Sequence, residues 1–592
     1  MKHLKLTAAI SALLLSSCTM LGPRNAQAFV WPAAWSTAQP GEAKYGGMLN
    51  AYGFTSFSSY NPFTNTDNPG PFMYLETGAN LFMPDPRDNQ PVPHMAAAQP
   101  IISEDGKVYT IKLREGLKFS DGTEITARDF VTTWKLHADK ELKSPLRSRF
   151  FMGEQPVTFE ALDPYTLRVT FPSPPATALN TLAFAPWPDH IFGAAYQKGG
   201  AKAVAELWGP QAKAGEVVSA GMLTLGQADN RPEGTVTFVK NRYWGEWNKD
   251  SQGRSLPYLD GLSVYMLKAS QPTLPRFLAG QADLAGFTSA ADARTINDAV
   301  KAGTLKANVL NNVGKLNVGT YLVFNWNKAD DPFKQALYRD VRFRRAVSHL
   351  INRQKMVDEI LGGMGEPTGS IIPAQHTAYI PADLPTYGYD PAAAAKLLAD
   401  LGFTQKDAEG YLVKDGKRAE FEILSYASDY TKKHMDIIIE DARAAGVKVT
   451  YRPIDGRELF KVLDATPDTL EKRPFDAAFY NASGPPSLWP FTASSARCDG
   501  VDHQFNRTGK CLTDEETKIA ALAMEGEREP DLQKRTVIGQ ELHRLLAEQQ
   551  YFIPIVAYTF GVAYNERIGG VLPPQYLTAP TRSTLYPLTF IR

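Results

Sequence analysis

The sequence predicts an α/β protein that is divided into several folding units. A single hydrophobic core does not usually organise as many as 592 residues. Hydrophobic residues make up 43% and charged residues 21% of the chain, which is typical of a soluble globular protein. Short runs of β-branched and apolar residues alternate along the chain with amphipathic helical stretches, as expected for α/β units.

The net charge argues against a nucleic-acid partner. Lysine plus arginine and aspartate plus glutamate both number 63, so the formal net charge is zero. Proteins that bind nucleic acid or anionic membranes through electrostatics usually carry an excess of basic residues. We therefore expect no nucleic-acid partner.

The first 28 residues predict an export signal followed by a tether. Lys2 and Lys5 precede the apolar stretch Leu6–Leu15. Ten residues are too few to cross a bilayer as a helix, which needs about 20. The longest later apolar run, Phe552–Tyr564, contains a proline and a glycine and predicts a buried strand.

Two processing sites compete in this leader. Leu15-Ser16-Ser17-Cys18 resembles the lipobox of bacterial lipoproteins, whereas Ala26-Gln27-Ala28 resembles a conventional signal peptidase site. We favour lipidation of Cys18, because this cysteine directly follows the apolar stretch. In either case the protein is exported to the periplasm or cell envelope. Its only expected membrane contact is a lipid anchor.

The elements of the first half follow in order. A flexible start is expected over Trp31–Lys44, and a first strand near Gly46–Leu49. Turn signals enclose a strand at Val108–Leu113, and Thr126 stands where the N-cap of a following helix belongs. Leu162–Phe171 alternates between apolar and polar residues, which predicts a half-buried strand.

The second half predicts further strand and helix pairs. A strand over Tyr321–Asn327 precedes a helix over Val341–Leu361. The helix in Tyr389–Phe403 starts at Asp390-Pro391 and stops at Gly402. A further helix, His434–Gly446, leads into a strand at Val447–Arg452.

One segment of the sequence resembles a known protein family. The segment YTIKLREGLKFSDGTEITARDF, residues 109–130, resembles the signature of the family 5 extracellular solute-binding proteins, which are the peptide- and dipeptide-binding receptors of ABC importers. Gly234–Trp244, Leu256–Asp260, Phe277–Leu284 and Tyr389–Phe403 resemble other parts of that family. The resemblance extends from Gly46 to about Gly570.

The resemblance implies a two-lobe periplasmic-binding-protein-like fold with a hinged cleft and an extra subdomain in the first lobe. Residues 1–28 are the signal and tether. The expected boundaries are 42–75, 187–315 and 555–592 for the first lobe, 76–186 for its extra subdomain and 316–554 for the second lobe.

The resemblance also implies a receptor function. The expected protein is a monomer that captures an oligopeptide or dipeptide between its lobes and delivers it to ABC permease subunits. An alternative is the same role for an oligosaccharide such as a cello-oligosaccharide. A less favoured one is an exported hydrolase on this scaffold. The nine histidines form no HxxxH, HxH or HExxH pattern, and no G-x-S-x-G or P-loop motif is present, so we expect no enzyme and no cofactor.

Candidate ligand-binding residues lie mainly on one segment of the expected second lobe. In the family, an aspartate there takes the α-amino group of a peptide, but Phe475–Phe491 lacks the acidic pattern. A neutral segment cannot pair an ammonium by direct charge, which is a stronger contact than a neutral hydrogen bond. The candidates are Trp489, Tyr480, Asn481 and Ser483 on this segment, Trp326 and Asn325 at the end of a strand, and Tyr52 near the N-terminus. For Trp326, packing in a core is an equally good interpretation.

Two of the three cysteines predict a disulfide. Cys498 and Cys511 lie thirteen positions apart in a loop-like region of an exported protein. Closing a loop of about 15 residues stabilises a protein by roughly 3 kcal/mol in the chain-entropy model. A metal site is not expected, because His503 lies between the cysteines without a CxxC motif or a second histidine.

Overall fold

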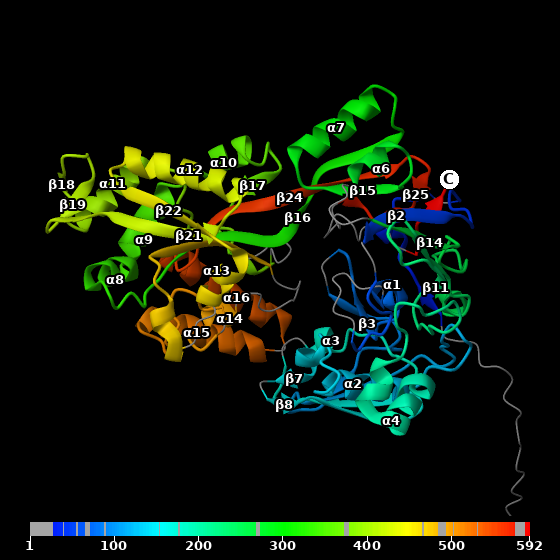
Figure 1. Ribbon diagram of the computed structural model, residues 1–592. Helices are drawn as coiled ribbons and strands as arrows, with labels where there is room; N and C mark the ends of the chain where they lie inside the picture. Colours follow the sequence, from blue (N-terminus) through cyan, green and yellow to red (C-terminus); the bar gives the residue numbers. More distant parts are fainter. Residues whose placement is uncertain are drawn as a thin grey trace, which may run out of the picture.

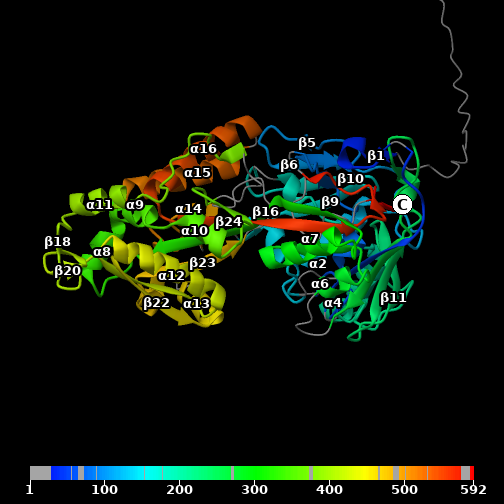
Figure 2. The same cartoon turned by 90° about the horizontal axis from the view of Figure 1, so that it is seen from above.

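The chain folds into two lobes, each with its own hydrophobic core, that are joined by two long strands (Figure 1). The computed structural model describes residues 28–39, 41–54, 57–64, 72–87, 90–152, 154–175, 178–267, 273–371, 378–463, 467–483, 493–500, 502–529, 531–574 and 587–592. The joining strands are β16 (Ala307–Phe324) and β24 (Ile553–Asn565). Figure 2 shows both of them passing from one lobe to the other.

The first lobe is built on a four-stranded sheet in the order β11-β12-β14-β2. Its strands are β2 (Met48–Phe54), β11 (Leu223–Ala228), β12 (Thr235–Lys240) and β14 (Gly261–Met266). β14 pairs in parallel with β2, although more than 200 residues separate them, and the other pairs are antiparallel. Short helices cover this lobe: α1 (Phe72–Glu76), α3 (Ala178–Thr181), α4 (Ala194–Ala205) and α5 (Trp244–Trp247).

A second sheet in the first lobe contains the family-like signature. It is antiparallel in the order β5-β6-β10-β9, and helix α2 (Ala127–Ala138) packs on it. The strands are β5 (Ile101–Ile102), β6 (Val108–Lys112), β9 (Thr158–Asp163) and β10 (Thr166–Thr170). The predicted N-cap is confirmed: Thr126 and Asp129 form a capping box at the start of α2.

The second lobe continues the sheet of β16 and β24 with β23 (Ala477–Ser483), β21 (Glu420–Tyr426) and β22 (Lys448–Ile454). β21 is parallel to both β22 and β23, whereas β16 is antiparallel to β23. The helices are α8 (Pro332–Arg339), α9 (Val341–His349), α10 (Arg353–Glu359), α11 (Pro391–Asp400), α12 (Asp429–Ala444), α13 (Gly456–Leu463), α14 (Ala493–Ala496), α15 (Asp514–Arg528) and α16 (Leu532–Gln549).

Helix boundaries in this lobe test two predictions. The start at Asp390-Pro391 is confirmed, because the Asp390 side chain accepts a hydrogen bond from the Ala393 amide. The single helix predicted over Val341–Leu361 is wrong. Asn352 breaks it by capping a new helix, α10, with its side chain accepting from the Lys355 amide.

A small third cluster lies beside the joining strands. β15 (Leu284–Phe287) and β17 (Gly365–Pro367) both pair with β24, while α6 (Leu274–Leu278) and α7 (Ala290–Lys301) pack nearby (Figure 1). Between the lobes, the ladder of β16 and β24 shifts its register three times, at Leu310/Gly314, Lys315/Gly319 and Gly319/Tyr321. Such bulges bend strands and interrupt their pairing.

The expected flexible start is wrong. β1 (Phe29–Val30) pairs in parallel with β13 (Asn248–Lys249), and Trp31 and Trp35 are 2% and 1% exposed in the first-lobe core. The Trp31 indole Nε1 donates to Asn248 Oδ1 at 2.8 Å. This segment is therefore part of the first lobe.

Replacing Trp31 with alanine is expected to destabilise the protein by about 3–5 kcal/mol, because a large buried side chain and its hydrogen bond are removed. Urea unfolding measures the difference. Val30→Ala is the matched control, because Val30 is 54% exposed and should change stability by about 0.5 kcal/mol or less. Equal stability of the two variants would contradict the burial of Trp31.

Within the described residues, no helix combines the length and the apolar character needed to cross a membrane.

Candidate ligand-binding site

Three parallel strands of the second lobe end at one edge of its sheet. β21 ends at Tyr426, β22 at Ile454 and β23 at Ser483. Because Ser483 pairs with Val318 of β16, this edge lies where the joining strands enter the second lobe. Ligands of open α/β sheets gather at the carboxyl ends of the strands. The edge is therefore the candidate site.

A chain of hydrogen bonds between side chains of four elements crosses this edge. Thr320 Oγ1 of β16 lies 2.9 Å from Asn481 Oδ1 of β23 and 2.7 Å from the hydroxyl of Tyr558 in β24. The Tyr430 hydroxyl of α12 lies 2.8 Å from that of Tyr558. A hydroxyl carries one proton, so Thr320 donates to Asn481 and accepts from Tyr558. Among the described residues, none accepts a hydrogen bond from Nδ2 of Asn481.

The four side chains of this hydrogen-bond chain carry no charge. Burial raises the pKa of Tyr558 and, more strongly, that of Tyr430, so both phenols keep their protons at physiological pH. Threonine and asparagine side chains carry no charge. This set of groups can exchange hydrogen bonds with a polar ligand but cannot form an ion pair with it.

Aromatic rings and two carboxylates also lie at or after the ends of β21 and β22. The rings of Tyr426, at the end of β21, and Phe460, in α13, have centroids 6.2 Å apart, and Phe460 is 43% exposed. The Tyr451 hydroxyl donates to the Tyr426 carbonyl, which fixes the end of β21. Asp429 begins α12 and Asp455 follows β22, and both are exposed. The edge thus offers an apolar ring face and two exposed carboxylates beside the neutral polar groups.

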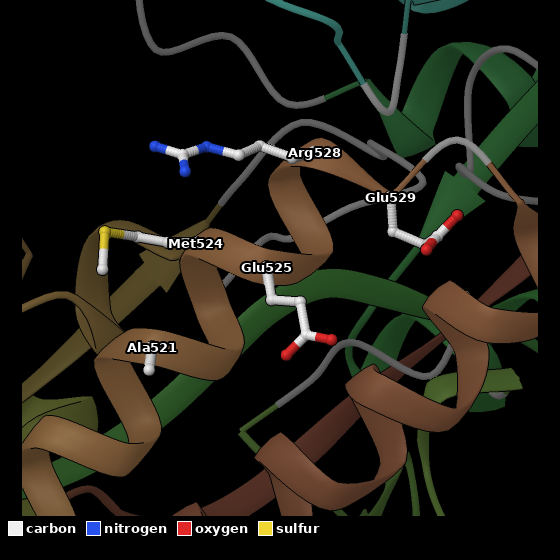
Figure 3. A pocket seen from close by; sticks show the side chains of 5 residues that line it. All are labelled: Ala521, Met524, Glu525, Arg528 and Glu529. Carbon is white, nitrogen blue, oxygen red and sulfur yellow. The ribbon is translucent and has the colours of Figure 1, made fainter.

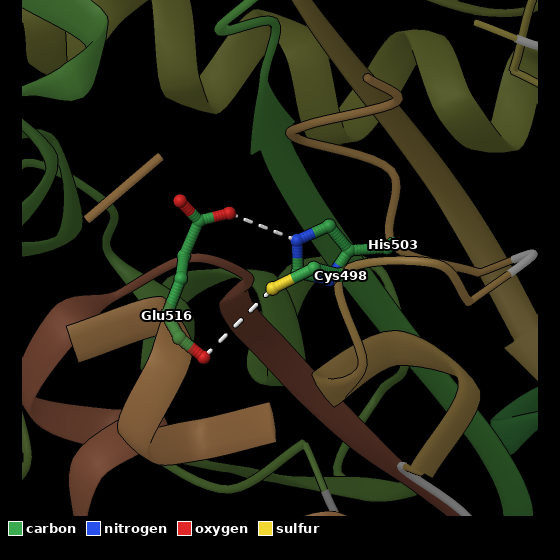
Figure 4. Close-up of side chains that lie close together, drawn as sticks. All are labelled: Cys498, His503 and Glu516. Atoms are coloured by element: carbon green, nitrogen blue, oxygen red, sulfur yellow. Dashed lines mark hydrogen bonds and ion pairs between the residues drawn. The ribbon is translucent and has the colours of Figure 1, made fainter. Parts of the chain in front are cut away.

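A second buried polar cluster lies beside a disulfide in the same lobe, and Figure 4 shows three of its residues, Cys498, His503 and Glu516. Cys498 and Cys511 are joined, with their Cα atoms 5.1 Å apart. Glu516 of α15 is fully buried, and its Oε1 accepts from His503 Nε2 at 3.0 Å and Asn506 Nδ2 at 2.8 Å. Its Oε2 accepts from the Leu512 and Thr513 amides. One carboxylate thus holds the disulfide loop against the start of α15.

This loop also supports the strand that leads to the candidate site. The Trp326 amide donates to the Phe505 carbonyl, and the Arg507 amide donates to Asn327 Oδ1. Both contacts fasten the loop to the residues directly after β16.

Comparison with known proteins identifies the family. Residues 90–500, more than half of the chain, match the family model of the bacterial extracellular solute-binding proteins, family 5 Middle. The chain belongs to this family. A probable ABC transporter-binding protein of Deinococcus radiodurans is 32% identical over 586 residues, covering 97% of each chain.

Solved structures support the two-lobe fold predicted for this family 5 protein. The oligopeptide-binding protein AppA from Bacillus subtilis, in complex with a nonapeptide, has a TM-score of 0.62 at 18% identity, covering 93% of this chain and all of its own. The periplasmic binding protein MelB from Agrobacterium fabrum, in complex with stachyose, has a TM-score of 0.65 at 20% identity, covering 95% of this chain and 87% of its own. The prediction of a two-lobe α/β fold is confirmed.

Of the predicted ligand residues, the structure brings Asn481 to the site and turns Tyr480 away from it. Neighbouring residues of a strand point to opposite faces. Asn481 joins the hydrogen-bond chain, whereas Tyr480 is buried in the second-lobe core with its ring 6.3 Å from that of Tyr321. Ser483 is the last residue of β23, and the backbone of Tyr52 belongs to β2, where it pairs with β14. Their side chains, and all of Trp489 and Cys18, lie outside the described residues.

Trp326 and Asn325 lie in the core of the second lobe. Trp326 is 1% exposed and packs against Phe505 and Tyr551, at centroid distances of 4.9 and 5.2 Å. Asn325 is fully buried, and its Nδ2 donates to the carbonyls of Arg473 and Phe475. This burial argues against the ligand contacts predicted for both residues, because neither side chain has surface to offer a solute in this conformation.

The residues that the sequence interpretation missed are Thr320, Tyr430 and Tyr558. Tyr558 stands inside an apolar run, and Tyr430 is one of many polar residues near a helix start. They meet only through the pairing of β16 with β24 and the packing of α12, so no local spacing signals their connection.

A pocket also lies on the surface of the second lobe, but it makes a poor ligand site. It is lined by Ala521, Met524, Glu525, Arg528 and Glu529, all from the end of α15 and the residue after it (Figure 3). A depression lined by one helix offers a ligand no opposing wall, whereas small-molecule sites enclose most of their ligand.

Proposed function

We propose that this protein is an exported substrate-binding protein that captures an oligopeptide or dipeptide between its lobes and hands it to the permease of an ABC transporter without altering it. The observation that carries the proposal is the neutral hydrogen-bond chain at the edge of the second lobe, beside the strands that join the lobes. A peptide backbone consists of neutral donors and acceptors, which such groups satisfy. A ligand that also touches the first lobe would stabilise a closed form.

The remaining parts of the proposal concern location and architecture. The protein is proposed to be exported to the periplasm or cell envelope, lipidated at Cys18 and monomeric, with a second lobe over residues 316–554. The extracellular character of the family supports the first of these.

An oligosaccharide is the second candidate ligand. The exposed ring of Phe460 beside Tyr426 supports it, because sugar faces stack on aromatic rings while their hydroxyls pair with neutral polar groups. A relative from Rhizobium meliloti, 26% identical over 423 residues, is a periplasmic alpha-galactoside-binding protein. Mass spectrometry of the small molecule that co-purifies from the native host separates peptide from sugar.

Tyr558→Phe is expected to weaken ligand binding about fivefold. The change removes the hydroxyl that joins Thr320 to Tyr430, which is worth about 1 kcal/mol and leaves Asn481 less firmly oriented. Isothermal titration with trialanine and with stachyose as probes measures the effect on whichever one binds.

Tyr564→Phe is the matched control, because it makes the same change in the same strand, at the first-lobe end. Its affinity should equal that of the unmodified protein. Equal affinities for the two variants would remove Tyr558 from the site. Conversion of either probe to products would refute the receptor function itself.

A further inference from the structure

Donor atoms of three chemical kinds converge beside the disulfide. Cys498 Sγ, a ring nitrogen of His503 and a carboxylate oxygen of Glu516 all lie within 4.8 Å of one another (Figure 4). All three side chains are buried. Thiolate sulfur, imidazole nitrogen and carboxylate oxygen are the ligands that zinc takes in proteins.

The imidazole of His503 is oriented as in a metal ligand. Its Nδ1 lies 2.7 Å from the Ser495 carbonyl, which can only accept, so Nδ1 carries a proton and donates it there. In metal-bound histidines, the N–H of the other ring nitrogen commonly donates a hydrogen bond to a carbonyl in this way. Nε2 is thereby aimed at Glu516.

The spacing of two of the donors suits a tetrahedral ion. His503 Nε2 and Glu516 Oε1 are 3.0 Å apart. Two ligand atoms with bonds of about 2.0 Å at a tetrahedral angle lie about 3.3 Å apart, so little movement is needed. Glu516 Oε2 keeps the Leu512 and Thr513 amides, so the carboxylate stays anchored while Oε1 turns to the metal and gives up its bonds from His503 and Asn506.

The fourth donor comes from the other sulfur of the disulfide. Cys511 Sγ is bonded to Cys498 Sγ but lies outside the group of three donors within 4.8 Å, so it must move towards the ion once reduction separates the two sulfurs. We propose that the reduced protein binds one zinc ion through Cys498, His503, Cys511 and Glu516, so that metal and disulfide are alternative closures of the same loop. The exchange balances as follows. A dithiol reductant breaks the bond between the two sulfurs and is itself oxidised to a disulfide, leaving two thiols. Zinc then displaces one proton from each thiol and takes the place of the proton on Nε2.

The closed loop has the same structural task in both forms. It holds Phe505 and Arg507 against the residues after β16. Reduction without a metal would remove the covalent closure, whereas bound zinc restores it by joining the same two sulfurs to His503 and Glu516. Zinc binding to such a set contributes directly to folding stability.

Cobalt(II) titration of the full chain tests the proposal, because cobalt reports thiolate ligands by its absorption. After reduction with a phosphine, we expect one equivalent of cobalt to bind with thiolate-to-metal charge-transfer and visible d–d bands, and zinc to displace it. Zinc should also raise the Tm of the reduced protein and leave that of the oxidised protein unchanged. Oxidised protein should bind on the order of 100-fold more weakly, because its sulfurs are not thiolates.

Two controls lacking free thiols keep His503 and Glu516 in place. One is the double variant Cys498→Ser, Cys511→Ser. The other is reduced protein alkylated at both cysteines, which serves if the double variant does not fold. Both should lose the thiolate bands and the zinc-dependent rise in Tm. Reduced protein that binds cobalt no more tightly than these controls, or than oxidised protein, would overturn the proposal.

Discussion

Replacing Glu516 with alanine is expected to lower the free energy of unfolding by about 3–5 kcal/mol. Removing one partner from a buried charged network leaves the other members without compensation, which is more costly than losing an exposed ion pair. Here the variant would leave the His503 ring, the Asn506 amide and two backbone N–H groups without their acceptor. Urea unfolding of the oxidised protein measures the change while the disulfide remains intact.

Two further variants separate the contribution of the network from that of the helix start. Glu515→Ala changes the preceding residue, which is exposed in the same first turn of α15, and should cost about 0.5 kcal/mol or less. Glu516→Gln keeps one acceptor oxygen but places an amide among donors, so its stability should lie between the two. If Glu516→Ala is as stable as Glu515→Ala, the network does not stabilise the lobe.

His94 and His137 are expected to lower the stability of the protein as the pH falls from about 6.5 towards 4, whereas Glu76, whose pKa burial raises to about 7, acts in the opposite direction. Burial lowers the pKa of His94 to about 4 and that of His137 to about 3, from an ordinary value of 6.5. Between these values the unfolded chain binds protons that the folded protein does not, so acid favours unfolding. One unit of separation is worth about 1.4 kcal/mol, so His94 alone accounts for about 2 kcal/mol between pH 7 and pH 5. Urea unfolding at the two pH values measures the loss.

His94→Gln tests the assignment. His94 Nε2 donates to Asn248 Oδ1, which accepts from Trp31 as well, and a glutamine amide can replace that donor without titrating. The variant should therefore lose about 2 kcal/mol less than the unmodified protein between pH 7 and pH 5. An unchanged pH dependence would show that the acid sensitivity arises elsewhere.

Features encoded by neighbouring residues could be predicted from the sequence. The capping box of Thr126 and Asp129 and the helix start at Asp390 depend on side chains that bond to backbone amides within three residues. The two-lobe fold could be predicted from the family-like segment of residues 109–130 for the same reason, because the residues of this segment are contiguous in the chain. The disulfide needed only the spacing of two cysteines and an exported compartment.

Features that depend on distant pairing could not be predicted. Trp31 is buried because its segment pairs with Asn248 and Lys249, more than 200 residues away. The candidate site requires Thr320 to meet Tyr558 across the shifted register of β16 and β24. Trp326 shows the reverse difficulty. A tryptophan at a strand end suits a ligand or a core equally well, and its packing against Phe505 and Tyr551 depends on residues far away in the chain.

The three register shifts between β16 and β24 have a mechanical consequence. Where pairing is already interrupted, few hydrogen bonds must break when the strands twist. A rotation of one lobe against the other would therefore be taken up over residues 310–321, while both cores move as rigid units. Elastic resistance at this joint would then be small. The balance between open and shut forms would depend on the surfaces that meet a solute, and not on the stiffness of the strands that carry them.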